Sequence, residues 1–258
     1  MRICVYASGS SGNCLLGSEN GTNILIDAGI SLRRIEQSLA RSELSMNDIG
    51  GVLITHEHSD HISALKQMAK KHRTRLFAPH TVAHRIMGML PETEDLFQII
   101  PVGEDFMIGT LTLRAFHTSH DTDESVGYRL GGFALATDTG CVTDEIRAGL
   151  CGAEAVLIES NHDEDLLRYG PYPIYLKKRI LSDRGHLSNE NCAELAEYLA
   201  ENGTKTVILG HLSKVNNSPE RALAASAERL RGRDVRLLCA PEFGKLEIMI
   251  GEDSICLG

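Results

Sequence analysis

The side chains best suited to chemistry lie in one run of seven residues. Thr-His-Glu-His-Ser-Asp-His contains His56, His58, Asp60 and His61, and it follows an apolar segment at residues 51–55 that we expect to be a strand. Imidazole nitrogen and carboxylate oxygen both bind divalent cations. In an extended segment, His56 and His58 point the same way and could bind one ion, while Asp60 and His61 come one turn later and could bind a second. The run is not the His-Glu-x-x-His of a zincin helix, because its fifth position is Asp60.

Further ligand types occur where later expected strands end. His117 and His120 follow one apolar strand, Asp138 follows another, and His211 follows a third. Each residue alone is more commonly a hydrogen-bonded loop residue. Their joint occurrence at strand ends indicates a site, because open sheets place their sites there.

The elements that must position these side chains alternate between strands and helices. Two mixed β-α halves predict an α/β protein with two sheets packed together and helices outside. We expect a single domain over residues 1–258; the alternative is two pseudo-symmetric halves that meet near residue 140. Strands are expected at residues 3–7, 14–17, 23–27, 51–55, 75–78, 125–130, 133–137, 155–159, 205–209, 235–239 and 246–250, and a β-hairpin that turns at Gly109-Thr110 is expected at 105–116. Helices are expected at about 31–39, 62–71, 79–89, 143–150, 172–181, 188–201 and 218–231.

Composition narrows the class of protein. The chain has 258 residues, of which 42% are apolar and 24% are charged, so it is expected to fold. Its net charge of −9 argues against a protein that coats nucleic acid non-specifically, although bound cations could invert the field at one site. Seven cysteines without a Cys-x-x-Cys predict buried thiols rather than disulfides. Without an apolar run of membrane length or a secretory segment, we expect a cytoplasmic enzyme with no membrane partner.

The ligand pattern resembles that of the metallo-β-lactamase fold superfamily over nearly the whole chain. More narrowly, several motifs resemble those of the YycJ/WalJ branch, which is related to the RNase Z and RNase J phosphodiesterases. The resemblance implies an αββα four-layer sandwich with a site along one edge of the paired sheets. The motifs that carry it lie at residues 7–13, 55–61, 119–121, 126–128, 136–140, 159–163, 185–190 and 211–214.

The resemblance also implies two divalent cations, whose identity as Zn, Mn or Fe stays open. His117 lies three residues upstream of the expected histidine ligand. We prefer His120 for that role, because the Ser-His-Asp motif fits it. The implied ligands are His56, His58 and His120 for one ion, Asp60, His61 and His211 for the other, and Asp138 as a bridge between them.

The implied mechanism is hydrolysis of a phosphodiester by a metal-bridging hydroxide, with Asp60 counted among the catalytic residues. In related phosphodiesterases, a His paired with a Glu protonates the leaving alkoxide. Glu159 and His186 match that pair, and a carboxylate behind an imidazole raises its basicity. The alternatives are a loop carboxylate at Glu159 and, at His186, a residue that binds a backbone carbonyl at the start of a helix.

Candidate substrate contacts are weaker. The loop at residues 8–13 offers backbone N–H groups and hydroxyls, so Ser10 and Asn13 could contact a phosphate, brace the metal loop or simply form a tight turn. Lys214 belongs to the last motif of the branch, and we expect it to contact substrate. His162 is a candidate for substrate contact or for a structural role.

We therefore expect a dinuclear metal-dependent phosphodiesterase, most specifically a 5′→3′ exonuclease that acts on DNA rather than RNA and needs no protein partner. The basic run of Lys177, Lys178 and Arg179, with Arg184 nearby, could follow a nucleic-acid backbone or be a solvated helix face. The acidic net charge favours an alternative, a small-molecule metallohydrolase acting on a thioester, lactone or cyclic phosphodiester. A regulatory metal-binding protein with a degenerate site is a third hypothesis, against which the complete ligand set argues.

Overall fold

The computed structural model describes residues 1–251. Cys256, one of the seven cysteines whose thiols were predicted to be buried, therefore lies outside the described residues. The chain forms two compact units. Among the described residues, the first comprises Met1–Ala115, Thr122–Glu124 and residues 241–251, and the second comprises Phe116–Asp121 and Ser125–Ala240. The division falls upstream of residue 140. That both units act as a single domain remains a prediction.

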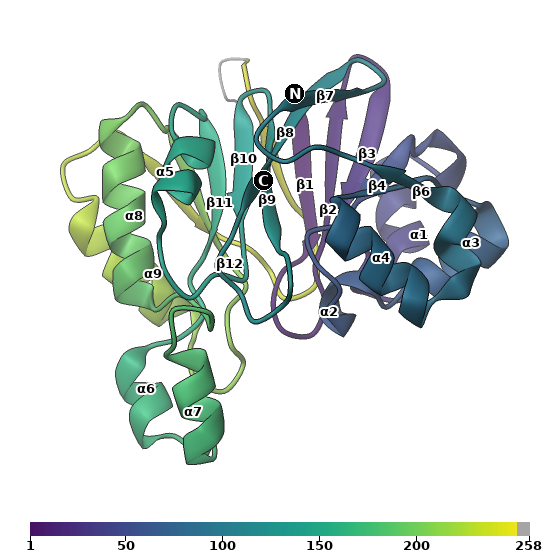
Figure 1. Ribbon diagram of the computed structural model, residues 1–258. Helices are drawn as coiled ribbons and strands as arrows, with labels where there is room; N and C mark the ends of the chain where they lie inside the picture. Colours follow the sequence, from purple (N-terminus) through teal and green to yellow (C-terminus); the bar gives the residue numbers. More distant parts are fainter. Residues whose placement is uncertain (252–258) are drawn as a thin grey trace. The chain divides into compact units, whose positions relative to one another are not determined.

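The first unit contains a mixed seven-stranded sheet (Figure 1). Its order is β14-β1-β2-β3-β4-β5-β6. Strands β14, β1, β2 and β3 pair antiparallel, and β3, β4, β5 and β6 pair parallel. The bounds are β1 (Arg2–Ala7), β2 (Cys14–Glu19), β3 (Thr22–Ile26), β4 (Gly51–Leu53), β5 (Leu76–Ala78), β6 (Phe97–Ile99) and β14 (Leu246–Met249).

Helices of the first unit share one apolar core with this sheet (Figure 1). Ser31 caps α1 by accepting a hydrogen bond from the Arg34 N–H, and Leu32, Ile35 and Leu39 form its buried face. The bounds are α1 (Leu32–Ala40), α2 (Ser59–Ile62), α3 (Leu65–His72) and α4 (His80–Met89), with 3₁₀ turns η1 (Met46–Asp48) and η2 (Pro91–Leu96). The strands β7 (Asp105–Ile108) and β8 (Leu111–His117) form the predicted hairpin, and the last two residues of β8 belong to the second unit.

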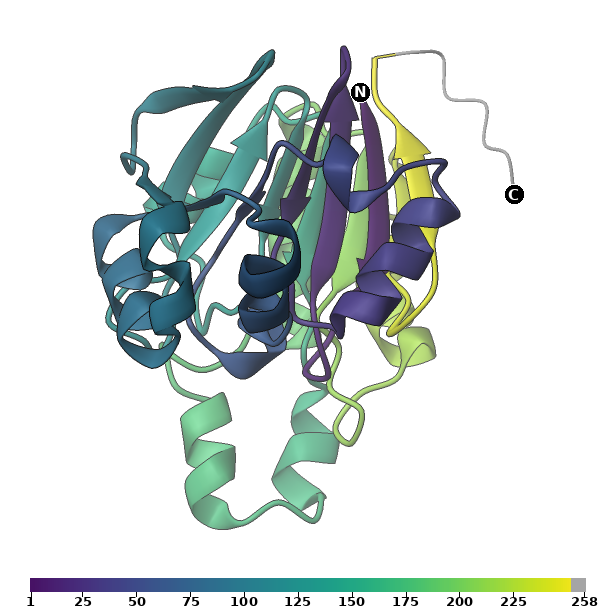
Figure 2. The ribbon, with the colours of Figure 1, turned by 90° about the vertical axis from the view of Figure 1, so that its right-hand side faces the viewer.

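The second unit is built on the strands β9 to β13, in the order β13-β12-β11-β10-β9. β9 and β10 pair antiparallel, and β10, β11, β12 and β13 pair parallel. The helices α5, α8 and α9 contribute to its apolar core, while α6 and α7 extend away from it (Figures 1 and 2). The bounds are β9 (Val126–Leu130), β10 (Phe133–Ala136), β11 (Ala155–Glu159), β12 (Thr206–Gly210), β13 (Arg236–Cys239), α5 (Asp144–Leu150), α6 (Glu164–Tyr169), α7 (Ile174–Ile180), α8 (Asn189–Glu201) and α9 (Pro219–Arg229).

Three elements differ from the sequence prediction. The helix expected at 62–71 is divided into α2 and α3 around Ser63 and Ala64. The edge strand β6 was not predicted; it is only three residues long, and its Gln98 and Ile99 are exposed. Helix α6 was also missed, although Asp163 caps it by accepting a hydrogen bond from the Leu166 N–H. Within residues 1–251, none of the helices has the length and apolarity that crossing a membrane requires.

Parallel pairing explains why ligand types gather within each unit. The carboxyl ends of parallel strands meet at one edge of a sheet. In the first unit, Asp27 follows β3 and Thr55 and His56 follow β4. In the second unit, Asp138 follows β10, and the next two strands end at Glu159 and just before His211.

Candidate metal site

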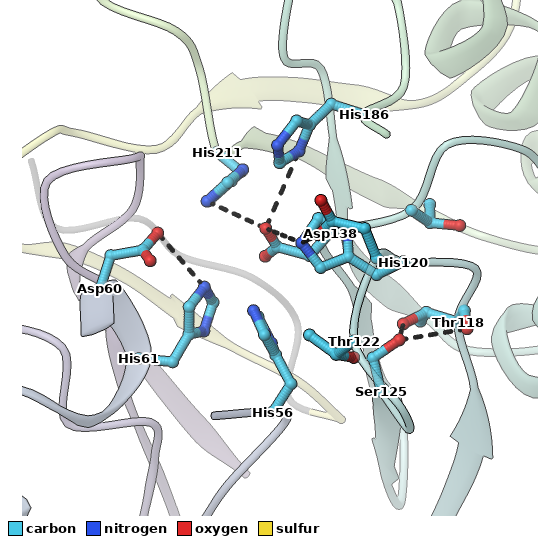
Figure 3. A network of polar contacts seen from close by, with 12 residues as sticks. His56, Asp60, His61, Thr118, His120, Thr122, Ser125, Asp138, His186 and His211 are labelled. Carbon is cyan, nitrogen blue, oxygen red and sulfur yellow. Dashed lines mark hydrogen bonds and ion pairs between the residues drawn. The ribbon is translucent and has the colours of Figure 1, made fainter. Parts of the chain in front are cut away.

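The segment after β4, which runs into helix α2, brings three imidazoles of the first unit together. The ring centroid of His56 lies 4.7 Å from that of His58 and 4.1 Å from that of His61. The Asp60 Oδ2 lies 3.5 Å from the His61 Nε2 (Figure 3). His56 and His61 are buried, and His58 and Asp60 are half-buried. The contiguous motif therefore supplies nitrogen and oxygen donors within a small volume, as a divalent cation requires.

A buried carboxylate that the sequence reasoning missed orients His61. The Asp27 Oδ2 lies 2.7 Å from the His61 Nδ1. Asp27 also accepts hydrogen bonds from the backbone N–H of Thr55, at 2.9 Å, and from its hydroxyl. A carboxylate on Nδ1 leaves Nε2 as the ligand atom, which is the arrangement that second-shell carboxylates give to metal-binding histidines. The sequence did contain a signal for Asp27, because it is an acidic residue directly after an apolar strand, as Asp138 is.

The loop at residues 8–13 braces the metal loop from inside the first unit. The buried Asn13 side chain accepts a hydrogen bond from the Gly9 N–H at 2.9 Å, and its Nδ2 lies 3.1 Å from the His61 Nε2. The Asn13 backbone N–H donates to the Asp60 carbonyl at 2.8 Å. A Cβ at Gly29 would lie 1.6 Å from that same carbonyl, so only glycine fits there. Ser10, in contrast, is exposed.

Asp138 is the centre of the donors in the second unit (Figure 3). Its Oδ1 lies 3.5 Å from the His211 Nε2, 3.7 Å from the His120 Nε2 and 3.8 Å from the His186 Nδ1. His120 is held by its other nitrogen, because its Nδ1 lies 3.0 Å from the Gly185 carbonyl oxygen. The strand-end residues of this unit thus surround one buried carboxylate, as their pattern predicts.

Glu159 contacts the Nδ1 atoms of two of these imidazoles. Its Oε1 lies 2.7 Å from the His186 Nδ1 and 2.9 Å from the His211 Nδ1, and its Oε2 accepts the Thr139 N–H at 2.8 Å. The closest donor atoms of Asp138, Glu159, His186 and His211 all lie within 4.8 Å of one another. With Nδ1 bonded to Glu159, the Nε2 of His211 faces Asp138 as a potential ligand atom. The donor set therefore fits a divalent cation.

Burial and charge shift the pKa values of this group in opposite directions. Burial lowers the pKa of the His120 imidazole below its ordinary value and outweighs the attraction of the Asp138 carboxylate. Burial also acts to lower the pKa of His186, but the charge and hydrogen bond of Glu159 raise it above the ordinary value. For Glu159, burial acts to raise the pKa, and the two imidazoles hold it well below its usual range. His120 is thus suited to bind as a neutral ligand and His186 to carry a proton.

Three residues of these two clusters have a left-handed backbone conformation. Asp27 has φ 59°, Asp138 has φ 55° and His211 has φ 55°. For residues other than glycine this conformation is uncommon, costs energy and concentrates at functional sites. In each case the turn comes directly after a parallel strand, where it redirects the side chain.

The remaining predicted residues are not among the donors of these clusters. His117 is exposed, and its Nδ1 lies 3.0 Å from Glu145, so His120 is the histidine beside Asp138. His162 is only 1% exposed, and burial lowers its pKa to about 4. Lys214 is exposed on the loop after β12. Substrate contact by Ser10, Asn13, His162 and Lys214 therefore remains a prediction.

Comparison with known proteins adds the family. Residues 22–212 match the model of the beta-lactamase superfamily domain. The chain is 38% identical to the exodeoxyribonuclease YycJ of Bacillus anthracis, over 86% of each chain. It is 37% identical to the exodeoxyribonuclease WalJ of Streptococcus pneumoniae, over 91% of this chain and 90% of that protein.

The fold has solved counterparts. The metallo-β-lactamase fold protein YhfI of Bacillus subtilis matches with a TM-score of 0.71 over 95% of this chain and 98% of that chain, at 12% identity. The predicted α/β fold class is therefore confirmed. The chain belongs to the metallo-β-lactamase fold superfamily, in its YycJ/WalJ branch, and is a metal-dependent hydrolase.

Proposed function

We propose that the chain is a dinuclear metal-dependent phosphodiesterase that degrades DNA as a 5′→3′ exonuclease. The observation that carries the proposal is the Glu159–His186 pair, which stands beside the Asp138 and His211 donors and can hold a proton next to a metal site. The names of the two exodeoxyribonuclease relatives support DNA as the substrate class. A cytoplasmic location and the absence of an obligate protein partner belong to the same proposal.

We infer seven metal ligands from the family resemblance. The family resemblance assigns them to two ions, for which Zn, Mn and Fe all suit the donor chemistry. When bound, such ions supply Lewis acidity and make water a nucleophile at neutral pH. The proposed ligands are His56, His58, Asp60, His61, His120, Asp138 and His211.

His186 is the proposed proton donor. Its Nδ1 is held by Glu159, so its Nε2 is the nitrogen that can donate to the oxygen leaving the phosphorus. The side chain is 20% exposed, whereas Glu159 is completely buried. The imidazole can therefore reach a substrate, and the carboxylate behind it maintains its charge and its orientation.

Exposed and buried residues have different parts in the proposed substrate binding. Ser10 and Lys214 are exposed and can contact a phosphate directly. Asn13 and His162 are buried. We propose that these two support the loops that carry the substrate contacts.

The test is degradation of DNA labelled at one end. Metal-loaded protein is incubated with single- and double-stranded DNA that carries a label on its 5′ or its 3′ end, and Asp138→Ala is the matched inactive control. We expect early release of the 5′ label in short products, while the 3′-labelled strand shortens gradually. Intact DNA with Mn, Zn and Mg would refute the proposal, and turnover of a small ester under those conditions would favour the small-molecule alternative.

A further inference from the structure

Helices α6 and α7 form a hairpin, here called the arm, that extends from the core of the second unit in both views (Figures 1 and 2). It carries large side chains that face solvent. Tyr169 is 85% exposed, Ile174 is 73% exposed and Tyr175 is 75% exposed. Large apolar surfaces that gather on one exposed element commonly mark a binding site.

The arm is basic within an acidic protein. Residues 164–180 carry four basic side chains and two acidic ones, Glu164 and Asp165 at the start of α6, so the net charge of the arm is +2 in a chain whose net charge is −9. The same stretch holds three of the six tyrosines. Its basic residues are Arg168, Lys177, Lys178 and Arg179. Aromatic rings interleaved with cations suit a polyanion that also presents flat apolar faces.

Local structure holds the arm in one shape. The Lys177 Nζ, on α7, donates to the carbonyl oxygens of Arg168 and Gly170, both at 2.8 Å, and so ties the end of α6 to α7. Pro171 and Pro173 restrict the connection between the helices. A surface that is already ordered loses little conformational entropy on binding.

The base of the arm is bonded to residues next to the proposed catalytic groups of the same unit. Arg179 forms an ion pair with Asp121, the residue after His120. The Arg184 Nε donates to the His120 carbonyl oxygen at 2.8 Å. The His186 N–H donates to the carbonyl oxygen of Ile180, the last residue of α7, at 3.0 Å. A ligand on the arm would thus be held by an element that continues into the His186 loop.

We propose that the arm binds single-stranded DNA, with Tyr169 and Tyr175 stacking on bases and Lys178 contacting a phosphate. This inference rests on the proposed function and assigns it a substrate form. Unpaired bases expose faces on which a tyrosine can stack, whereas paired bases are covered by their neighbours. The arm would therefore engage a single strand or the single-stranded end of a duplex.

Fluorescence anisotropy with the metal-loaded full chain tests the arm. The probe is a labelled phosphorothioate oligothymidylate of about 20 nucleotides, which resists hydrolysis during the titration. We expect Tyr169→Ala and Tyr175→Ala each to weaken binding about tenfold. We expect Lys178→Ala to reduce the slope of log K against log salt by about 0.7, because one phosphate contact is lost. Arg231→Ala and Met107→Ala, which remove an exposed charge and an exposed apolar side chain elsewhere, should bind like the wild type.

A kinetic measurement on unmodified DNA separates binding from chemistry. The arm variants should raise KM for single strands about tenfold and change kcat less than threefold. Folded tyrosine variants that bind the oligonucleotide as tightly as the wild type would overturn the inference and leave the arm as a surface for another partner. If those variants bind normally while the wild type shortens DNA, only the arm inference fails. If the wild type neither binds nor shortens DNA, the proposed function fails with it.

Discussion

The histidine cluster of the first unit and that of the second unit are positioned in different ways. In the first, His56, His58 and His61 come from one continuous segment, which runs from the loop after β4 into helix α2. In the second, His120, His186 and His211 come from three separate segments. A contiguous motif needs only local bonds to bring its donors together, whereas dispersed donors depend on the sheet and on a shared partner.

The two clusters also differ in how many imidazoles their buried carboxylate holds. Asp27 contacts a single imidazole, that of His61. Glu159 contacts two imidazoles, those of His186 and His211. We therefore expect the second unit to be the more sensitive to loss of one buried acid.

The largest effect is expected for Glu159→Gln. The change removes the charge that orients both imidazoles, so it impairs proton donation and a metal ligand together. We expect kcat on DNA to fall about 10³-fold. Rates measured with saturating metal, beside the exposed control Glu190→Gln, test this. A loss below threefold in a folded protein would show that Glu159 does not support the chemistry.

A smaller and more selective loss is expected for His186→Ala. Cleavage of DNA should fall about 10²-fold, because the leaving alkoxide needs a proton. Bis(p-nitrophenyl) phosphate should lose less than tenfold, since p-nitrophenolate leaves without one. Comparison of the two substrates with one enzyme preparation is the measurement, and equal losses would remove His186 as the proton donor.

In the first unit, Asp27→Asn should act on metal affinity. Loss of the negative partner of the His61 Nδ1 makes that imidazole a poorer ligand, and we expect affinity to fall about 10- to 100-fold. Competition with a chelating dye measures the change against the exposed control Asp105→Asn. Unchanged affinity would mean that Asp27 has a structural role alone.

The smallest effect is expected for Asn13→Ala, which leaves the Gly9 N–H and its neighbours without their side-chain partner. The free energy of unfolding should fall by about 1–3 kcal/mol. Urea denaturation in the presence of a chelator measures it without a metal contribution, and the exposed neighbour Ser11→Ala is the control. Equal stability of the two variants would contradict a bracing role for the loop.

The sequence predicted the contiguous cluster of the first unit more completely than the dispersed cluster of the second unit. The reason is again the separation of the donors along the chain. The His56–His61 motif could be read directly, because its ligands are neighbours in the chain. Asp138 and His211 were recognisable because apolar strands precede them. Asp27 obeys the same rule, but which strands pair in parallel is decided by the sheet, so its link to His61 was not visible. The left-handed backbone at Asp27, Asp138 and His211 depends on tertiary context in the same way, whereas the short helix α6 had a local signal in its Asp163 cap.

A metal titration of exonuclease activity tests the central claim most directly. Divalent manganese is added stepwise to chelator-treated protein, and release of the 5′-terminal nucleotide from labelled single-stranded DNA is recorded at each step. We predict no release without metal, an increase up to about two equivalents per chain and a plateau beyond them. Release that does not depend on metal, or no release at any metal content, would contradict the account.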